Sequence, residues 1–225
     1  IAVQSDPPDG GPAELIVNPR IYYGERTTEY VIVNTNTDEL DYQAAGGELR
    51  SIKYDGEGGV SISSFINRIA YAWQFGDVNI LITGEITGAS KLQYRRQIQE
   101  RISTIAPFLR LDDDPYVVVA EGRLFWMQDA YTVSDRFPYS DPIPSGEETG
   151  FNYIRNSVKV TVDAFDGTVG FYVWDQDDPL IRTYQKIFPD MFEPRDQMPE
   201  SLQAHVRYPQ DLFGFQAAKY LKYHM

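Results

Sequence analysis

The sequence predicts an α+β fold in which antiparallel β-hairpins are packed with helices and the C-terminal part is mostly helical. Residues 116–133 and 157–174 are rich in β-branched and aromatic side chains, and each stretch contains a turn dipeptide, which is typical of hairpins. Residues 61–76 and 94–106 have apolar side chains at helical spacing. The strand pattern ends after residue 175, and later helices can begin at three prolines, Pro179, Pro199 and Pro209.

The composition of the chain excludes several classes of protein. With 225 residues, of which 42% are hydrophobic and 14% aromatic, the chain can bury a core, so disorder throughout is excluded. The net charge of −13 repels phosphate backbones and anionic lipid head groups, so nucleic acid is not expected as a partner. The absence of cysteine excludes disulfides, thiolate zinc sites and cysteine nucleophiles. No apolar run approaches the roughly 20 residues that a transmembrane helix needs.

The N-terminal end has the composition of a connecting segment. We expect residues 1–13 to form a linker or extended arm, because residues 2–12 are rich in Pro, Gly and Asp. Residues 14–225 are expected to form one domain, with the polar, proline-rich stretch 134–150 as the place where it would divide. The chain begins at Ile1 and not at Met, so we expect further sequence before it.

The first part of the expected domain contains two short strands and an irregular segment. Residues 20–25 and 29–35 are β-branched and aromatic and are separated by turn residues, which predicts two strands. Residues 44–59 contain too many glycines for a regular element, except for a short strand at residues 53–54. This glycine-rich segment lacks the Lys-Ser/Thr ending of a phosphate-binding loop.

Two amphipathic helices are expected next. The first begins behind Ser61 or Ser63 and ends near Gly76. Its apolar positions are Ile62, Phe65, Ile66, Ile69, Ala70 and Trp73. The second runs from about Tyr94 to Ala106, before Pro107. Its expected buried stripe is Ile98, Ile102 and Ile105, and three arginines line the other face, Arg95, Arg96 and Arg101. These arginines either form a solvated face paired with carboxylates or bind an anion.

Two hairpins follow in the sequence. The first has Glu121–Gly122 as its turn, and its strands are apolar on both faces, which predicts a pair at the centre of the sheet. The second alternates strictly, and a two-residue type I′ turn at Asp166–Gly167 would place Val162 opposite Phe171. Its expected buried face consists of Val160, Val162, Val169, Phe171 and Val173. On the other face, Lys159 can lie over the ring of Trp174.

A set of motifs, in this order, resembles a large uncharacterised family of bacterial integral membrane proteins. The motifs are NPRIYYGE, YDGEGGV, APFLRLDDDPY, DAYTVS followed by PYS, NYIRNSVK, DAFDG, DDPLI, KIFPDMF and RYPQDLF. Small departures occur in residues 39–43 and at Val133, and the final KYHM resembles the start of a motif that continues downstream. The resemblance implies a multi-pass protein of the cell membrane, with N-terminal transmembrane helices that this fragment lacks. It implies an extracytoplasmic location for this chain, and it implies no reaction.

Two kinds of polar cluster are candidate sites. Six aspartates in two groups could ligate calcium, although Asp-Asp-Pro is also a turn and helix-start sequence. These are Asp112, Asp113 and Asp114, and Asp175, Asp177 and Asp178. Asn152, Arg155 and Asn156 could recognise a carboxylate or a sugar, or they could close the strand entrance by bonding loop carbonyls.

The sequence favours a module without catalytic activity or a required cofactor, which serves interaction or assembly at the cell envelope with an envelope protein or a second copy as partner. The alternative is an envelope glycan or peptide hydrolase, or a binding protein, that uses paired carboxylates. A serine hydrolase lacks support, because there is no G-x-S-x-G and His205 and His224 are the only imidazoles. A pocket with converging carboxylates would favour the enzyme, and a flat apolar patch would favour the interaction module.

Overall fold

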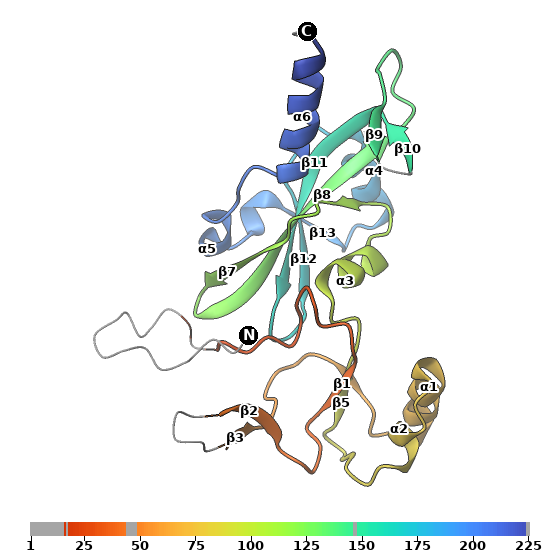
Figure 1. Ribbon diagram of the computed structural model, residues 1–225, viewed down its shortest axis with the longest axis vertical. Coiled ribbons are helices and arrows are strands. Elements are labelled where there is room, and N and C mark those ends of the chain that lie inside the picture. The colour runs from red at the N-terminus through yellow and green to blue at the C-terminus, as the bar shows by residue number, and fades with distance from the viewer. Residues whose placement is uncertain (1–15, 17, 44–48, 146–147, 224–225) are drawn as a thin grey trace, which may run out of the picture.

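A six-stranded sheet forms the centre of the larger lobe in the computed structural model, which describes residues 16, 18–43, 49–145 and 148–223 (Figure 1). Its main path is β13 (Phe192–Pro194), β12 (Val169–Val173), β11 (Tyr153–Asp163), β8 (Arg123–Ser134) and β6 (Arg110–Leu111). The sixth strand, β7 (Tyr116–Ala120), pairs with the first half of β8. All these pairs are antiparallel except β12 with β13.

Helical segments cover both faces of this sheet. On one face, α3 (Ile98–Ile105) and α4 (Pro179–Ile187) pack Ile98, Ile102 and Ile181 on the valines of β11. On the other face, a segment that contains η1 (Arg195–Gln197) and α5 (Glu200–Gln203) packs Met198 and Leu202 on Met127 and Tyr172. The sheet therefore lies in the middle of a three-layer arrangement.

A smaller lobe lies below the larger one in Figure 1. Its three-stranded sheet has the order β1 (Val31–Val33), β5 (Lys91–Gln93), β4 (Val60–Ser61). Two helices, α1 (Phe65–Phe75) and α2 (Asn79–Ile82), and a hairpin of β2 (Glu39–Gln43) and β3 (Leu49–Ile52) complete it. Its core is a separate cluster of buried side chains, Ile62, Ala72, Ile80, Ile86 and Leu92.

The remaining elements lie at the opposite end of the molecule. A short hairpin of β9 (Ile143–Ser145) and β10 (Glu148–Phe151) lies beside the C-terminal helix α6 (Gln210–Tyr223), which projects at the top of Figure 1. These elements confirm the predicted α+β class, with antiparallel hairpins and helices after residue 178. None of the helices in the described ranges is both long and apolar enough to cross a membrane.

The first hairpin has the predicted turn. Glu121 and Gly122 have φ angles of 54° and 74°, and Ala120 pairs with Arg123, as a two-residue type I′ turn requires. β8 is central, since it pairs with β11, β7 and β6, whereas β7 pairs with β8 alone among the described strands. The expectation of two central strands is therefore correct only for β8.

The second hairpin has the predicted faces but a different turn. Val160, Val162, Phe171 and Val173 are buried in the main core, and Val169 packs against it. Val162 pairs with Val169 and not with Phe171, so the register differs by two residues, which leaves each side chain on its expected face. The Asp163 carboxylate accepts hydrogen bonds from the backbone N–H groups of Phe165 and Asp166, at 2.8 and 2.9 Å, and these bonds stabilise a longer loop.

The outer face of this hairpin carries a buried ion pair. Lys159 lies across from Asp129 of β8 and forms a salt bridge with it, and both side chains are buried. The Lys159 ammonium lies 5.8 Å from the centre of the Trp174 ring, which confirms the predicted contact. Burial raises the pKa of the Asp129 carboxyl, and the attraction of Lys159 opposes this change.

Several predicted boundaries need correction. Residues 20–25 are not a strand, because the N–H groups of Tyr22 and Tyr23 both donate to the Ala164 carbonyl and cannot form a ladder. The strand predicted at 29–35 is observed as the shorter β1, and residues 53–54 are not a strand, because β3 ends at Ile52. The first helix begins at Phe65 behind Ser64, and Gly76 ends it with φ 65°.

The second helix begins four residues later than predicted. Residues 91–93 pair with β1, and Arg95 then has φ 50°, which no helix residue adopts. Arg95 and Arg96 therefore precede α3 and do not lie on its face. Ile98 and Ile102 are buried as predicted, but Ile105, in the last turn, is exposed.

Asp166 joins the two lobes. Its carboxylate accepts hydrogen bonds from the Tyr54 hydroxyl at 2.8 Å, the Glu57 N–H at 2.9 Å and the Arg123 guanidinium at 2.6 Å. A Cβ atom on Gly58 would lie 2.3 Å from the Asp166 carbonyl oxygen, so this position admits only glycine without movement. The motif YDGEGGV in the smaller lobe thus contacts the motif DAFDG in the larger lobe, and these contacts form the junction between the lobes.

Candidate functional site

The three polar residues at the entrance of β11 do not converge. The Asn152 amide accepts from the Phe137 N–H at 2.9 Å and donates to the Phe137 and Ser140 carbonyls at 2.7 and 3.2 Å. Arg155 forms an ion pair with Asp175 at 3.2 Å. Asn156 donates to the Asp129 carboxylate at 3.1 Å. Each side chain thus has its own intramolecular partner.

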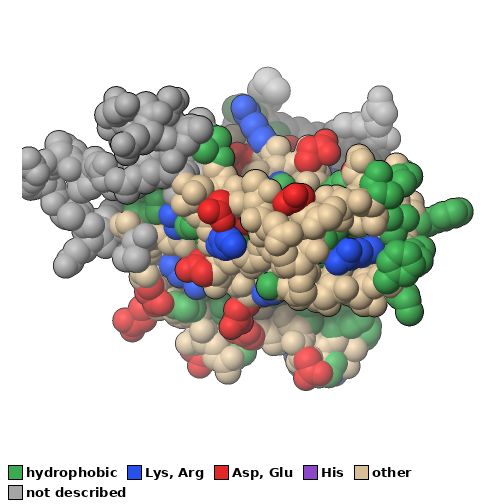
Figure 2. Space-filling view, turned by 90° about the horizontal axis from the view of Figure 1, so that it is seen from below, with side chains coloured by type: hydrophobic (Ala, Val, Ile, Leu, Met, Phe, Trp, Pro, Cys, Tyr) green, Lys and Arg blue, Asp and Glu red, His purple; other side chains and the backbone are tan. Residues whose placement is uncertain are grey.

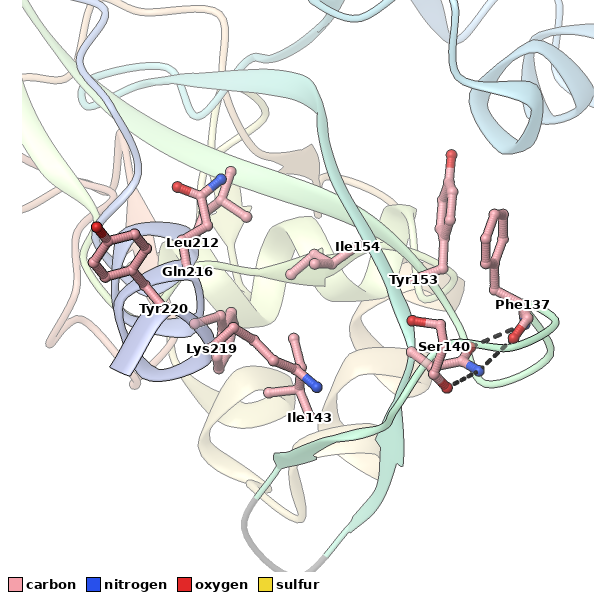
Figure 3. Close-up of a pocket in the computed structure, with 11 residues that line it drawn as sticks. Phe137, Ser140, Ile143, Tyr153, Ile154, Leu212, Gln216, Lys219 and Tyr220 are labelled. Carbon is pink, nitrogen blue, oxygen red and sulfur yellow. Dashed lines mark hydrogen bonds between the residues drawn. The ribbon is translucent and has the colours of Figure 1, made fainter. Parts of the chain in front are cut away.

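Asn152 nevertheless lies at the edge of a groove of about 560 Å³ (Figure 3). Figure 3 shows α6 on one side of the groove, with Tyr153 and Phe137 on the other. The lining residues are Phe137, Ser140, Ile143, Asn152, Tyr153, Ile154, Leu212, Phe215, Gln216, Lys219 and Tyr220. The rings of Phe137 and Tyr153 stack at 5.6 Å. Among the described residues that line the groove there is no Asp or Glu, so it lacks the carboxylate pair of a glycosidase.

The first aspartate group holds Arg207 and the start of α6 against the sheet. The buried Asp112 carboxylate accepts from the Tyr131 hydroxyl, from the Asp211 N–H at 3.0 Å and from the Asp114 N–H at 3.0 Å. Burial and this hydrogen bond to Asp112 raise the pKa of the Tyr131 hydroxyl. Asp114 forms an ion pair with Arg207, and the Asp113 N–H donates to the Asp211 carboxylate.

The second aspartate group contains the N-cap of α4. Asp178 is fully buried, and its carboxylate accepts from the Thr132, Ser157 and Tyr153 hydroxyls, each at 2.6 Å. It also accepts from the N–H groups at the start of α4, at 3.1 and 3.3 Å. Burial opposes ionisation of Asp178, but these hydrogen bonds outweigh it and lower the pKa of the carboxyl.

The two aspartate groups do not form a cation cage. Asp175 pairs with Arg155, Asp177 is exposed, and Asp178 caps a helix. Across the described ranges, no three His, Cys, Asp or Glu side chains are placed to hold one metal ion. Four of the six carboxylates instead bind hydroxyls, backbone N–H groups or arginines, namely those of Asp112, Asp114, Asp175 and Asp178.

The most prominent surface feature is an apolar face on α1 and α2, which we call the α1–α2 face. It consists of Phe65, Ile66, Ile69, Trp73, Val78 and Ile82, and all six side chains are exposed. Trp73 retains 89% of its accessible surface and Ile66 retains 76%. Figure 2 shows hydrophobic side chains gathered at the right-hand edge of the molecule, the side on which Figure 1 places α1 and α2.

The opposite side of α1 explains why this face is outward. Ala72 is buried there, and the Phe75 ring stacks on Tyr30 at 4.7 Å, with Tyr71 alongside. The helix therefore has apolar side chains on both sides and can bury only one in its own lobe. A helix that is apolar all round is usually covered on every side. Tyr71 and Phe75 lie outside the predicted apolar stripe of this helix, and these two extra aromatic residues are the feature of the sequence that indicates a second contact surface.

Comparison with known proteins places the chain in a family. The model of the uncharacterised protein family UPF0182 matches residues 6–225. The chain belongs to UPF0182. The UPF0182 protein of Pelotomaculum thermopropionicum is 49% identical over 98% of this chain and 24% of its own length. That of Bradyrhizobium diazoefficiens is 52% identical over 96% of this chain and 23% of its own length.

The chain corresponds to one part of its longer UPF0182 relatives. It spans about a quarter of the length of the curated relatives that it matches, including 22% of the UPF0182 protein of Sulfurovum sp., to which it is 50% identical over 91% of this chain. No solved structure matches the chain. The α1–α2 face therefore belongs to a chain whose relatives contain about three times as much further sequence.

Proposed function

We propose that this chain is an extracytoplasmic module of a multi-pass UPF0182 membrane protein, and that it acts by assembly and not by catalysis. The α1–α2 face is the contact surface, and its partner is another part of the same polypeptide. The observation that carries this proposal is the exposure of Phe65, Ile66, Ile69 and Trp73 on one side of a single helix.

The apolar area favours a permanent contact. Burial of a large apolar side chain contributes about 1.5–3 kcal/mol, so six such side chains supply on the order of 10 kcal/mol before the costs of association. Monomeric proteins seldom leave a continuous apolar patch of this kind in water. In relatives about four times as long as this chain, the rest of the polypeptide is joined to the corresponding region, so it can contact the face without the entropy cost of bringing two free molecules together.

The charges near the face favour an apolar protein partner. Arg68 is the only charged residue in α1, and its guanidinium turns to the carbonyl oxygens of Ile62 and Ile86, at 3.0 and 3.5 Å. No unpaired charge therefore lies in the α1 part of the face, and the carboxylate of Asp77, next to Val78, accepts hydrogen bonds from the Tyr30 hydroxyl and the Asn79 N–H. The net charge of −13 opposes close approach of the whole chain to anionic lipid, which favours protein over a bilayer surface as the partner.

The partner can be identified in the full-length protein. A photo-crosslinking amino acid at Trp73 should form a cross-link to another segment of the same polypeptide, which peptide mass spectrometry can locate. The same amino acid at the exposed Thr183 of α4 is the matched control and should give no such product. Cross-links from Trp73 to lipid alone, or none, would contradict the proposal, and a covalent dimer would assign the face to a second copy.

The location rests on the ordered motifs that resemble membrane proteins with an extracytoplasmic region. A cysteine at the exposed Ser140 of the full-length protein should react with an impermeant maleimide in intact cells. Reaction only after the membrane is opened, with an external control labelled normally, would place the chain on the cytoplasmic side.

A second function is favoured by the groove in Figure 3. Its aromatic rings and its Gln216 and Lys219 side chains suit a glycan or an extended peptide, which would be bound without hydrolysis. Titration of the full-length protein with envelope glycan fragments and peptides tests this, and Gln216→Ala should weaken any binding that occurs there. Equal affinity in that variant would exclude the groove.

A further inference from the structure

A second, smaller cleft lies between the two lobes and contains two arginines. Its volume is about 240 Å³, which suits a small molecule and not a polymer. It is lined by Tyr23, Gly59, Val60, Leu92, Tyr94, Arg95, Arg101, Thr104 and Ile105. Arg101, Thr104 and Ile105 come from α3 of the larger lobe. Val60 and Leu92 come from the sheet of the smaller lobe.

Arg101 is held in place with part of its guanidinium unused. Its Nε donates to the Gly167 carbonyl at 2.7 Å, and its guanidinium carbon lies 4.8 Å from the centre of the Tyr23 ring. Within the described part of the chain, its two terminal nitrogens have no hydrogen-bond partner and no carboxylate within ion-pair distance. An arginine fixed by its Nε presents the donors that bind a carboxylate or a phosphate.

Arg95 reaches the same cleft from a strained backbone position. Its φ of 50° costs free energy for a residue with a side chain, and such positions often occur at binding sites. It is exposed, 5.8 Å from the Tyr94 ring, and no described carboxylate pairs with it. Arg96, by contrast, donates to the Tyr22 and Glu29 carbonyls at 2.6 and 3.0 Å and is structural.

Neither arginine has a carboxylate partner among the described residues, although the chain is acidic. There are 33 acidic residues for 20 Lys and Arg, so a carboxylate partner would be easy to supply at either position. The cleft instead offers an apolar floor of Val60, Leu92 and Ile105 and the hydroxyl of Thr104. Two cations beside an apolar surface suit a ligand that carries negative charge on an apolar body.

We propose that this cleft binds a small organic anion, with a carboxylate or phosphate group held by Arg95 and Arg101 and an apolar body against the floor. Because the lining residues belong to both lobes, the bound anion also fixes the lobes relative to each other. This inference concerns a ligand site and does not depend on the partner of the α1–α2 face.

Calorimetric titration of the full-length protein tests the site with three probes of similar size. Phenyl phosphate and benzoate carry the two oxyanions, and benzyl alcohol is the uncharged counterpart. At least one anion should bind, binding should weaken as salt concentration rises, and benzyl alcohol should not bind. The anion that binds more tightly identifies the natural group as phosphate or carboxylate.

Two variants locate the binding. Arg95→Gln should weaken the affinity for the anion at least tenfold. The variant should keep the parent melting temperature, because the exposed Arg95 side chain has no hydrogen bond or ion pair among the described residues and only a distant contact with the Tyr94 ring. Arg182→Gln, in α4, removes an exposed arginine outside the cleft and should leave the affinity unchanged. The proposal is overturned if neither anion binds, if benzyl alcohol binds equally well, or if Arg95→Gln binds as the parent does.

Discussion

The Asp178 carboxylate is the most heavily hydrogen-bonded acid that we describe, so its removal gives a sharp test of the fold. In Asp178→Ala the hydroxyls of Thr132 and Ser157 lose their acceptor at 2.6 Å in a fully buried place. The start of α4 loses its N-cap in the same step. The Tyr153 hydroxyl also loses a partner, but Tyr153 is only partly buried and water can replace it.

The expected loss of stability follows from these contacts. Loss of an N-cap costs about 1 kcal/mol. Hydrogen bonds from two buried hydroxyls to a charged acceptor contribute about 1.5–3 kcal/mol each, and part is regained because the two hydroxyls, 3.1 Å apart, can bond to each other. The free energy of unfolding should therefore fall by about 4 kcal/mol, which lowers Tm by roughly 8–16 °C in a chain of this length.

Urea unfolding of the 225-residue chain at several pH values measures this difference. Because the pKa of Asp178 is below that of an unfolded aspartate, its stabilisation is fully present above about pH 4 and is lost as pH falls through the folded-state pKa. The difference between Asp178→Ala and the parent should be constant from about pH 5 to 7 and should shrink below about pH 4. Asp177→Ala is the control, since the neighbouring side chain is exposed. A loss below about 1 kcal/mol for Asp178→Ala at pH 7 would refute the reasoning.

Two further predictions concern metals and the loop after β11. Removal of calcium with a chelator should change Tm by less than about 1 °C. A calcium ion present at about 100 times its dissociation constant would instead stabilise the fold by about 2.7 kcal/mol. A rise in Tm of several degrees when calcium is added back would show that the aspartate groups do bind it. Gly167→Ala should destabilise the chain by about 2–4 kcal/mol, because φ is 70° and the new Cβ would lie 2.5 Å from the Tyr23 ring; thermal melting within 2 °C of the parent would show that the loop adjusts freely.

The faces of the second hairpin could be predicted from sequence, but its register could not. A period of two fixes which side of a sheet each residue faces, so Val160 and Phe171 were correctly assigned to the core. A shift of two residues preserves that pattern, so apolar pairing cannot detect it. The difference depends on Asp163, whose side chain bonds to two backbone N–H groups and makes the longer loop the stable one.

The candidate surfaces were harder to predict for a related reason. Spacing identified α1 as amphipathic, but the lobe packs on the side of Tyr71 and Phe75 and leaves Trp73 outside. Spacing also grouped three arginines on one helix, whereas Arg95 has a positive φ and α3 begins only at Ile98, so Arg101 alone of the three lies on the helix. Sequence gives the polarity of a segment, and only tertiary contacts decide which of two similar sides is buried.

The loop after β11 connects these observations, because its length places three groups that a two-residue turn would place elsewhere. Asp163 caps the loop. Asp166 binds Tyr54 across the lobe junction and Arg123 within its own lobe, and the Gly167 carbonyl accepts a hydrogen bond from Arg101. Gly167 also lies against the Tyr23 ring on which Arg101 rests. A shorter turn would keep the apolar face intact yet remove both the junction and the fixed position of Arg101. The hydrogen bonds of Asp163 stabilise the longer loop and thereby also position Arg101 at the inter-lobe cleft, the proposed anion site.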